Sequence, residues 1–188
     1  MSTAGGTIGA NAPDPAHLRE VFDTVERMVE DRWGIPVTIS DVPNPFTGDL
    51  DGQHIMVDYD LEIEDAVFIL IHLFGHTVQW NVSERSREIA FARPGQWTDE
   101  QLAEVADYER EACRYSLQLL HDAGFHDLDQ WVSDFAACDA AYLMHFYRTG
   151  EKRPFRQFWR DNAPLITALP IPPFHPTRWI SRYDGTVI

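Results

Sequence analysis

Two histidines separated by four positions lie in the most apolar stretch of the chain. His72 and His76 belong to residues 62–80, EIEDAVFILIHLFGHTVQW, which contain no proline and no glycine before Gly75. Four residues of an α-helix turn through about 400° and rise about 6 Å, so the two imidazoles leave one helix face. Two ring nitrogens on one face can bind a single metal ion, and the spacing therefore indicates a metal site. The alternative is an ordinary pair of core and surface histidines.

Glu109 is the best candidate for a third ligand. The segment from Thr98 to about His121 repeats small and apolar residues at steps of three and four, and position 109 falls in the middle of this stripe. The stripe consists of Leu102, Val105, Ala106, Ala112, Cys113, Ser116, Leu117 and Leu120. A buried ionised carboxylate is unfavourable unless it is paired or binds a metal. We therefore predict that His72, His76 and Glu109 hold one divalent metal ion, with zinc as the first choice and iron(II) as the alternative.

Three further expectations concern the surroundings of this site. Glu111 lies about 200° around the helix from Glu109 and is expected to face water. Glu109 could instead pair with an arginine, and Arg85 and Arg110 are the candidates for that role. Gly75 stands in the middle of a helix, where glycine costs about 1 kcal/mol relative to alanine, and so indicates close packing against a neighbouring element.

The residue after the first histidine limits the chemistry that the site can perform. The sequence His72-Leu73-Phe74-Gly75-His76 matches the zinc-peptidase motif H-E-x-x-H in its ligand positions, but Leu73 occupies the position of the glutamate. In a zinc peptidase that glutamate moves protons, and general acid–base catalysis contributes about 10²–10⁴-fold to the rate. A leucine cannot transfer a proton, so conventional peptidase activity is not expected.

Asp139 is the candidate for a replacement acid or base. It lies on the apolar stripe of a helix predicted to begin with Asp127 as its cap and to end at Gly150. It could transfer protons, orient a ligating histidine, or be a hydrogen-bonded buried aspartate without a role at the site. Glu84 is a second candidate base. Three arginines of the segment 81–97 could hold a substrate carboxylate or phosphate, although solvated surface charge is the alternative for each. They are Arg85, Arg87 and Arg93.

The elements that position these residues indicate an α+β fold with a small β-sheet beside several helices. We expect a helix from Pro15 to Trp33, strands at 35–40 and 54–59 that run antiparallel or lie near one another, and then the helix of His72. A loop over 81–97, two long helices and a short helix near 155–160 follow. Residues 1–13 are expected to be flexible, 14–163 to form one domain, and the proline-rich residues 164–188 to pack on it in extended conformation.

Composition and charge restrict the classes of partner. Thirty acidic against fifteen basic residues give a net charge of −15, which argues against nucleic-acid binding. The two cysteines, Cys113 and Cys138, make no disulfide framework and read as buried thiols. No signal peptide is recognisable, and the apolar run 66–74 is too short to cross a bilayer. A cytoplasmic protein without a membrane partner is therefore expected.

The layout of these segments resembles the ImmA/IrrE family of zincin-like metallopeptidases. The similar segments are VTIS and HIMVDY, then FILIHLFGHTVQW, then YEREACRYSLQLL, and they fall within residues 15–121. The resemblance implies a zincin-like fold in which His72, His76 and Glu109 bind zinc. The family's catalytic glutamate corresponds to position 73 and has no counterpart in this chain.

Three hypotheses about function follow. The first is a metal-dependent enzyme that keeps the zincin-like scaffold and ligands but acts on a small molecule. The second is an inactive metallopeptidase-like module that binds a protein partner or regulates one. The third is a metallopeptidase that takes its base from another position, with Asp139 or Glu84 as the candidates.

Overall fold

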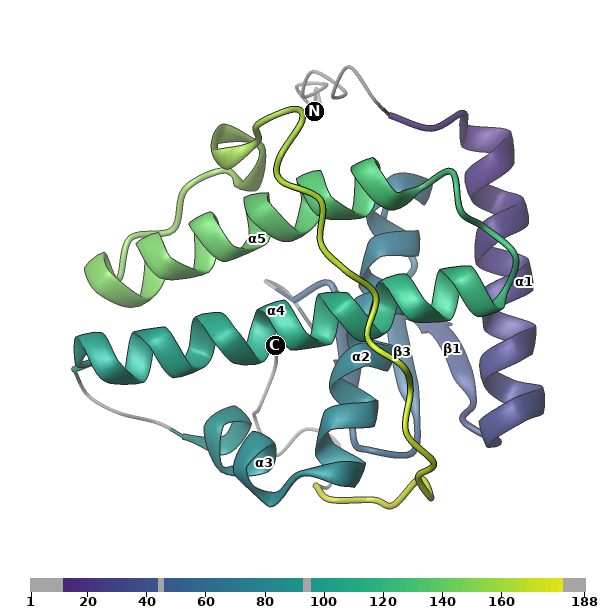
Figure 1. The fold of residues 1–188 in the computed structure, drawn as a ribbon, viewed down its shortest axis with the longest axis horizontal. Helices are drawn as coiled ribbons and strands as arrows, with labels where there is room; N and C mark the ends of the chain where they lie inside the picture. The colour runs from purple at the N-terminus through teal and green to yellow at the C-terminus, as the bar shows by residue number, and fades with distance from the viewer. Residues whose placement is uncertain (1–11, 44–45, 93–95, 181–188) are drawn as a thin grey trace.

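The computed structural model describes residues 12–43, 46–92 and 96–180, and within them the chain has the expected α+β architecture (Figure 1). The elements in chain order are α1 (Pro15–Trp33), β1 (Val37–Ser40), β2 (Gly48–Leu50), β3 (Ile55–Asp58), α2 (Ile63–Val82), α3 (Glu84–Phe91), α4 (Asp99–Asp122), α5 (Asp129–Thr149) and a 3-10 helix η1 (Phe155–Phe158). Most of the predicted flexible N-terminus, Arg93 and the last eight residues of the tail lie outside the described residues.

The three strands form one sheet in the order β1-β3-β2. β3 pairs parallel with β1, Val37 opposite Ile55, so the two strands lie side by side, but the antiparallel alternative is wrong. The turn-rich segment between these strands contains the three-residue strand β2. β2, rather than β1, forms the antiparallel hairpin with β3. β2 lies against α2, since a Cβ atom added at Gly48 would come within 2.7 Å of side-chain carbons of Ile69 and Leu73.

Helix α2 is the centre of the domain, and α4 crosses it (Figure 1). Every residue of α2 from Leu70 to Trp80 is buried. At the crossing, Ser116 of α4 donates a hydrogen bond to the Ile71 carbonyl at 2.8 Å, and a Cβ atom added at Gly75 would lie 2.3 Å from the Ala112 carbonyl oxygen. The expectation that Gly75 serves close packing is therefore confirmed, and this close approach brings the two ligand-bearing helices together.

The segment predicted as a loop over 81–97 contains helix α3, so that prediction is wrong for its middle part. The Ser83 side chain caps this helix by accepting a hydrogen bond from the Ser86 amide at 3.1 Å. Helix α5 begins at Asp129 with Leu128 as its cap, one residue later than the predicted cap at Asp127. Several adjacent residues could serve as the N-cap of a helix, so the ends of a helix are harder to predict from sequence than its centre.

Residues after η1 cross α5 and α4 without regular secondary structure and reach the turn before β3 (Figure 1). The Leu169 amide donates to the Arg114 carbonyl at 3.1 Å, and the Trp179 amide donates to the Asp51 carbonyl at 2.8 Å. Both cysteines are buried free thiols, as expected. None of the helices found in the described ranges combines the length and the apolar character that crossing a membrane requires.

Candidate metal centre

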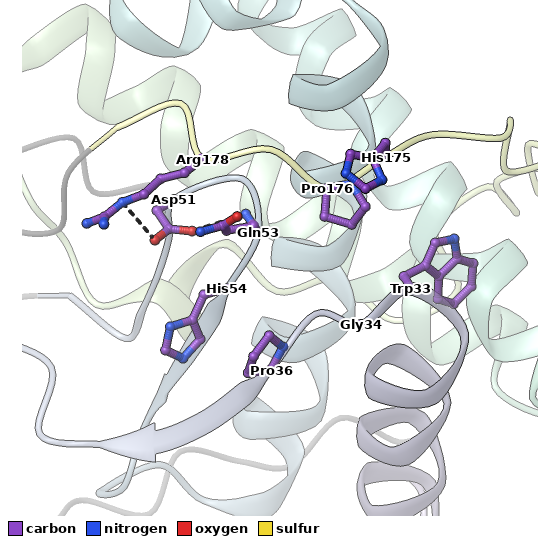
Figure 2. A pocket seen from close by; sticks show the side chains of 9 residues that line it. All are labelled: Trp33, Gly34, Pro36, Asp51, Gln53, His54, His175, Pro176 and Arg178. Atoms are coloured by element: carbon purple, nitrogen blue, oxygen red, sulfur yellow. Dashed lines mark hydrogen bonds and ion pairs between the residues drawn. The ribbon is translucent and has the colours of Figure 1, made fainter.

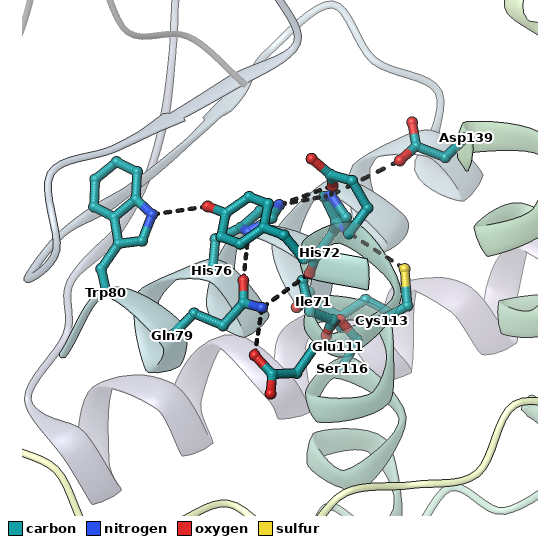
Figure 3. A network of polar contacts seen from close by, with 12 residues as sticks. Ile71, His72, His76, Gln79, Trp80, Glu111, Cys113, Ser116 and Asp139 are labelled. Carbon is teal, nitrogen blue, oxygen red and sulfur yellow. Dashed lines mark hydrogen bonds and ion pairs between the residues drawn. The ribbon is translucent and has the colours of Figure 1, made fainter. Parts of the chain in front are cut away.

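Helices α2 and α4 bring the three predicted ligands into one cluster (Figure 3). The Nε2 atoms of His72 and His76 are 3.0 Å apart, and each lies 3.2 Å from Oε2 of Glu109. Ligand atoms around a tetrahedral zinc ion with bonds of about 2.0–2.1 Å are separated by about 3.3–3.4 Å. The three atoms therefore form a nearly equilateral triangle of the size that a metal ion requires, and the cluster could hold one.

The cluster is almost completely shielded from solvent. His76, Glu109 and His72 are 0%, 4% and 5% exposed. Burial by itself raises the pKa of Glu109, but the charge interaction with His76 and hydrogen bonds with both histidines outweigh it and lower the pKa to about 2. The Glu109 side chain is therefore a carboxylate at neutral pH and a good metal ligand.

The alternative in which Glu109 pairs with an arginine is wrong. The Arg85 guanidinium binds Glu88 at 2.9 Å and Glu104 at 2.7 Å, and Arg110 pairs with Asp107. These pairs lie on the surface of α3 and α4, where the side chains of both arginines are at least 60% exposed. The partners of the buried carboxylate are the two histidines.

Gln79 fixes which nitrogen of His76 faces the cluster. The Gln79 amide nitrogen donates to the Tyr108 carbonyl at 2.9 Å and to Glu111 Oε2 at 2.7 Å, so its oxygen must point at His76. That oxygen lies 2.9 Å from His76 Nδ1 and accepts a hydrogen bond from it. A neutral ring with its proton on Nδ1 presents the Nε2 lone pair to the cluster, as metal binding requires. The contact with Glu109 that lowers the pKa of that carboxyl instead has a proton on Nε2.

The residues around Gln79 are the part of the site that sequence reasoning missed. Glu111, expected to face water, is half-buried and accepts the hydrogen bond from Gln79, so that expectation is wrong. The Tyr108 ring stacks on His76 with centroids 4.5 Å apart, and its hydroxyl accepts a hydrogen bond from Trp80 at 2.8 Å. A buried glutamine one turn after a ligand histidine was the available signal, because such a side chain needs partners for both ends of its amide.

His72 has different surroundings from His76. Its ring stacks on Phe68 with centroids 5.3 Å apart, and its Nδ1 faces the Cys113 sulfur at 3.5 Å. Burial raises the pKa of the Cys113 thiol well above its usual range, and the charges of Asp139 and Glu109 raise it further. Cys113 is thus a neutral thiol that makes a weak hydrogen bond with the ring nitrogen opposite the cluster.

Asp139 of α5 reaches the same cluster (Figure 3). Its Oδ2 atom is 3.9 Å from His72 Nε2, and its side chain is 17% exposed. Burial raises the pKa of Asp139 to about 7; the charge of His72 acts in the opposite direction, and the charge of Glu109 acts in the same direction. Leu73, in contrast, is 2% exposed and packs toward β2, so the position of the missing glutamate supplies only an apolar side chain.

The other predicted residues lie on α3. Arg85 is engaged with Glu88 and Glu104 on the surface. The Arg87 guanidinium stacks over the Trp179 ring at 3.8 Å and donates to the Trp80 carbonyl, which ties the tail to α2. Glu84 is exposed in the first turn of the helix. The substrate-binding role of Arg85 and Arg87 and the possible base role of Glu84 remain predictions.

A hollow separate from the cluster lies between the end of α1, the turn before β3 and the tail (Figure 2). It has a volume of about 660 Å³. Its lining consists of Trp33, Gly34, Pro36, Asp51, Gln53, His54, His175, Pro176 and Arg178. The Arg178 guanidinium pairs with Asp51 at 3.6 Å at one end of the hollow, and none of the predicted site residues belongs to it.

Comparison of the chain with protein-family models, with curated proteins and with solved structures found no match. The resemblance to the ImmA/IrrE family therefore stays a prediction that rests on the residues quoted for it.

Proposed function

We propose that this protein is a metal-dependent enzyme that acts on a small molecule and has lost the peptidase glutamate of a zincin-like scaffold. The observation that carries the proposal is the convergence of His72 Nε2, His76 Nε2 and Glu109 Oε2 within 3.0–3.2 Å of one another. A metal-binding helix beside a small sheet, with the third ligand on a later helix, supports the zincin-like part of the proposal.

The donor set favours a borderline divalent metal, zinc first and iron(II) as the alternative, because two imidazoles and one carboxylate suit both ions. Such an ion would supply Lewis-acid chemistry by polarising a carbonyl or phosphoryl oxygen of the substrate. The chain contributes fixed ligand orientations, since Gln79 holds the His76 ring and Phe68 stacks on the His72 ring. Fixed ligands reduce the reorganisation that catalysis would otherwise require.

Asp139 is the residue that we assign to proton transfer. It is the side chain that brings a carboxylate next to the ligand cluster without being one of the three ligands, with Oδ2 at 3.9 Å from His72 Nε2. Phe68, stacked on His72, supplies apolar atoms to the same region, which limits water at the site and strengthens electrostatic interactions there. Asp139 would therefore take the role that the leucine at position 73 cannot fill.

The near-complete burial of the ligands favours a second candidate function as well. Metal sites whose ligands are fully enclosed commonly serve structure rather than turnover. An inactive metallopeptidase-like module that uses the metal to hold α2 and α4 together would have the same buried cluster. This candidate predicts metal binding without catalysis.

Turnover by the metal-loaded protein separates the two candidates. We expect hydrolysis of at least one member of a panel of small carboxylic esters, amides and phosphate esters, with the activity lost in Glu109→Ala and reduced in Asp139→Asn. Glu104→Ala, which removes an exposed carboxylate on the same helix, is the matched control and should keep full activity. A fully loaded protein that hydrolyses none of these substrates faster than Glu109→Ala would contradict the enzyme proposal.

A further inference from the structure

Two carboxylates, the buried Glu109 and the half-buried Asp139, lie beside the histidine pair. Asp139 and Glu109 both act on His72, and among the described residues the charges that bear on Asp139 are those of His72 and Glu109. Neighbouring buried carboxylates repel each other and are unfavourable unless a cation compensates them. Asp139 therefore lies where an anionic side chain needs a positive partner.

Two other groups of acids pair with an arginine, whereas the fully buried Asp134 accepts hydrogen bonds from Gln130 and the Ala163 amide. Arg156 binds both Glu64 and Asp65 at the start of α2, at 2.9 and 2.8 Å. Arg178 pairs with the buried Asp51 at 3.6 Å. At the centre of α2, no arginine or lysine of the described residues joins Glu109 and Asp139, which carry a charge of −2 when both are ionised. One divalent cation neutralises that set.

We propose that Asp139 is a fourth protein ligand of the metal when no substrate is bound, an inference that rests on the metal site of the proposed function. The separation of 3.9 Å between Asp139 Oδ2 and His72 Nε2 exceeds the ligand–ligand distance of a tetrahedral site by about half an ångström. Asp139 lies outside the set of atoms that are within 4.8 Å of one another, so its side chain must turn toward His76 and Glu109 to bind the same ion. The resulting set is two nitrogen and two oxygen donors with no net charge.

The position of Asp139 is fixed by the packing of α5. Phe135, one helical turn earlier, stacks on Phe68 of α2 with ring centroids 4.5 Å apart. On its other side, Arg156 lies over the Phe135 ring at 4.8 Å, and the Cys138 sulfur donates to the Phe155 carbonyl at 3.4 Å. The helix is thus held between α2 and η1, and Asp139 is presented to the cluster by a rigid element.

A fourth protein ligand makes the resting site closed and couples substrate binding to the release of Asp139. A substrate oxygen or another small anion must displace the carboxylate before it can reach the site. The released Asp139 then stays beside the cluster, where the proposed function needs a group that accepts a proton. The same side chain therefore serves first to close the site and then to transfer the proton.

Azide titration of the cobalt(II)-substituted protein tests this inference. Visible absorption of cobalt(II) responds to a change of ligand, and azide is a small anion that occupies an open coordination position. We expect the wild-type spectrum to resist azide, whereas Asp139→Ala and Asp139→Asn change their spectra at azide concentrations lower by about tenfold or more, because azide no longer competes with the carboxylate. Asp129→Asn, which removes an acid of the same helix that pairs with His121, should behave as wild type.

The outcomes separate this inference from the proposed function. If wild type and both variants bind cobalt and respond to azide equally, Asp139 is not a ligand and the inference is wrong, while the metal site of the proposed function stands. If wild type binds no cobalt, both are wrong. If Asp139→Ala does not fold, the smaller change Asp139→Asn and the azide resistance of wild type decide the question.

Discussion

Two clusters of acidic side chains contact helix α2, and they differ in whether a cation of the chain neutralises them. At its first turn, Glu64 and Asp65 are bound by the guanidinium of Arg156, which arrives from η1. In its middle, His72 and His76 meet Glu109 and Asp139, and the described part of the chain places no arginine or lysine among them. The first cluster is complete within the chain, whereas the second presents converging lone pairs and carboxylates that an external cation would complete.

The largest effect is expected from a substitution that moves apart the two helices that carry the metal ligands, α2 and α4. Gly75→Ala places a Cβ atom 2.3 Å from the Ala112 carbonyl oxygen and forces α2 away from α4. We expect a loss of about 2–3 kcal/mol in the free energy of unfolding and a failure to retain metal. Denaturant unfolding and metal analysis measure both effects. Ala103→Ser, an exposed change on α4, should stay within about 0.5 kcal/mol, and normal metal retention in Gly75→Ala would contradict the account.

A smaller effect is expected when the ligands stay in place but lose their support. Gln79→Leu removes the acceptor that holds the His76 Nδ1 proton and leaves Glu111 without its amide partner. Loss of such an outer partner weakens metal binding by roughly 10–100-fold. Competition with a fluorescent zinc chelator measures the change. Gln118→Leu, which removes a surface hydrogen bond to Asp122, is the control, and equal affinities in the two variants would show that Gln79 does not orient His76.

A change in the cluster of Glu64, Asp65 and Arg156 should lower the free energy of unfolding and leave metal binding largely intact. Arg156→Gln leaves Glu64 and Asp65 without their cation, and since this cluster is only partly buried we expect a loss of about 1 kcal/mol. Metal affinity should change far less than in Gln79→Leu, because the metal cluster contains neither acid and Phe135 still packs on Phe68. Urea unfolding with and without bound metal tests both statements. A drop in metal affinity as large as that of Gln79→Leu would mean that the two clusters are not independent.

The smallest effect concerns the surface pair of α3. Arg85→Gln removes ion pairs with Glu88 and Glu104 between side chains that are about half exposed or more. Such pairs contribute little, so the midpoint of thermal unfolding should shift by an amount equivalent to less than about 0.5 kcal/mol. A shift as large as that of Arg156→Gln would contradict the view that burial, rather than the presence of a pair, sets the effect.

The ligand set could be predicted from sequence because each ligand lies on a helix whose apolar residues fix its buried face. His72 and His76 share a face by spacing alone, and the apolar stripe of α4 identified Glu109 as the buried acid. The hydrogen bonds of Gln79 with Tyr108 and Glu111 depend on where α4 crosses α2, and the crossing point cannot be read from a single sequence. For the same reason the sequence predicts that Glu111 faces water, whereas Gln79 of α2 contacts it in the structure.

The errors in the fold have local causes. β2 has three residues, too few for a recognisable alternation, and without it the direction of β3 relative to β1 could not be inferred. Helix α3 is short and rich in charged residues, so its sequence resembles a loop until the Ser83 cap is recognised. Asp139 was found as an acid on an apolar stripe, but its distance from His72 is a property of how α5 packs on α2.

The most direct test of the central claim is the metal content of purified wild-type protein beside Glu109→Ala, measured by elemental analysis after dialysis, with circular dichroism to show that both are folded. The account predicts about one divalent ion per wild-type chain and a loss of metal affinity in the variant greater than the roughly 10–100-fold caused by losing an outer partner. Zinc or iron in wild type would also identify the metal. A folded wild-type protein that binds no metal even after reconstitution, or a variant that binds it equally well, would contradict the account.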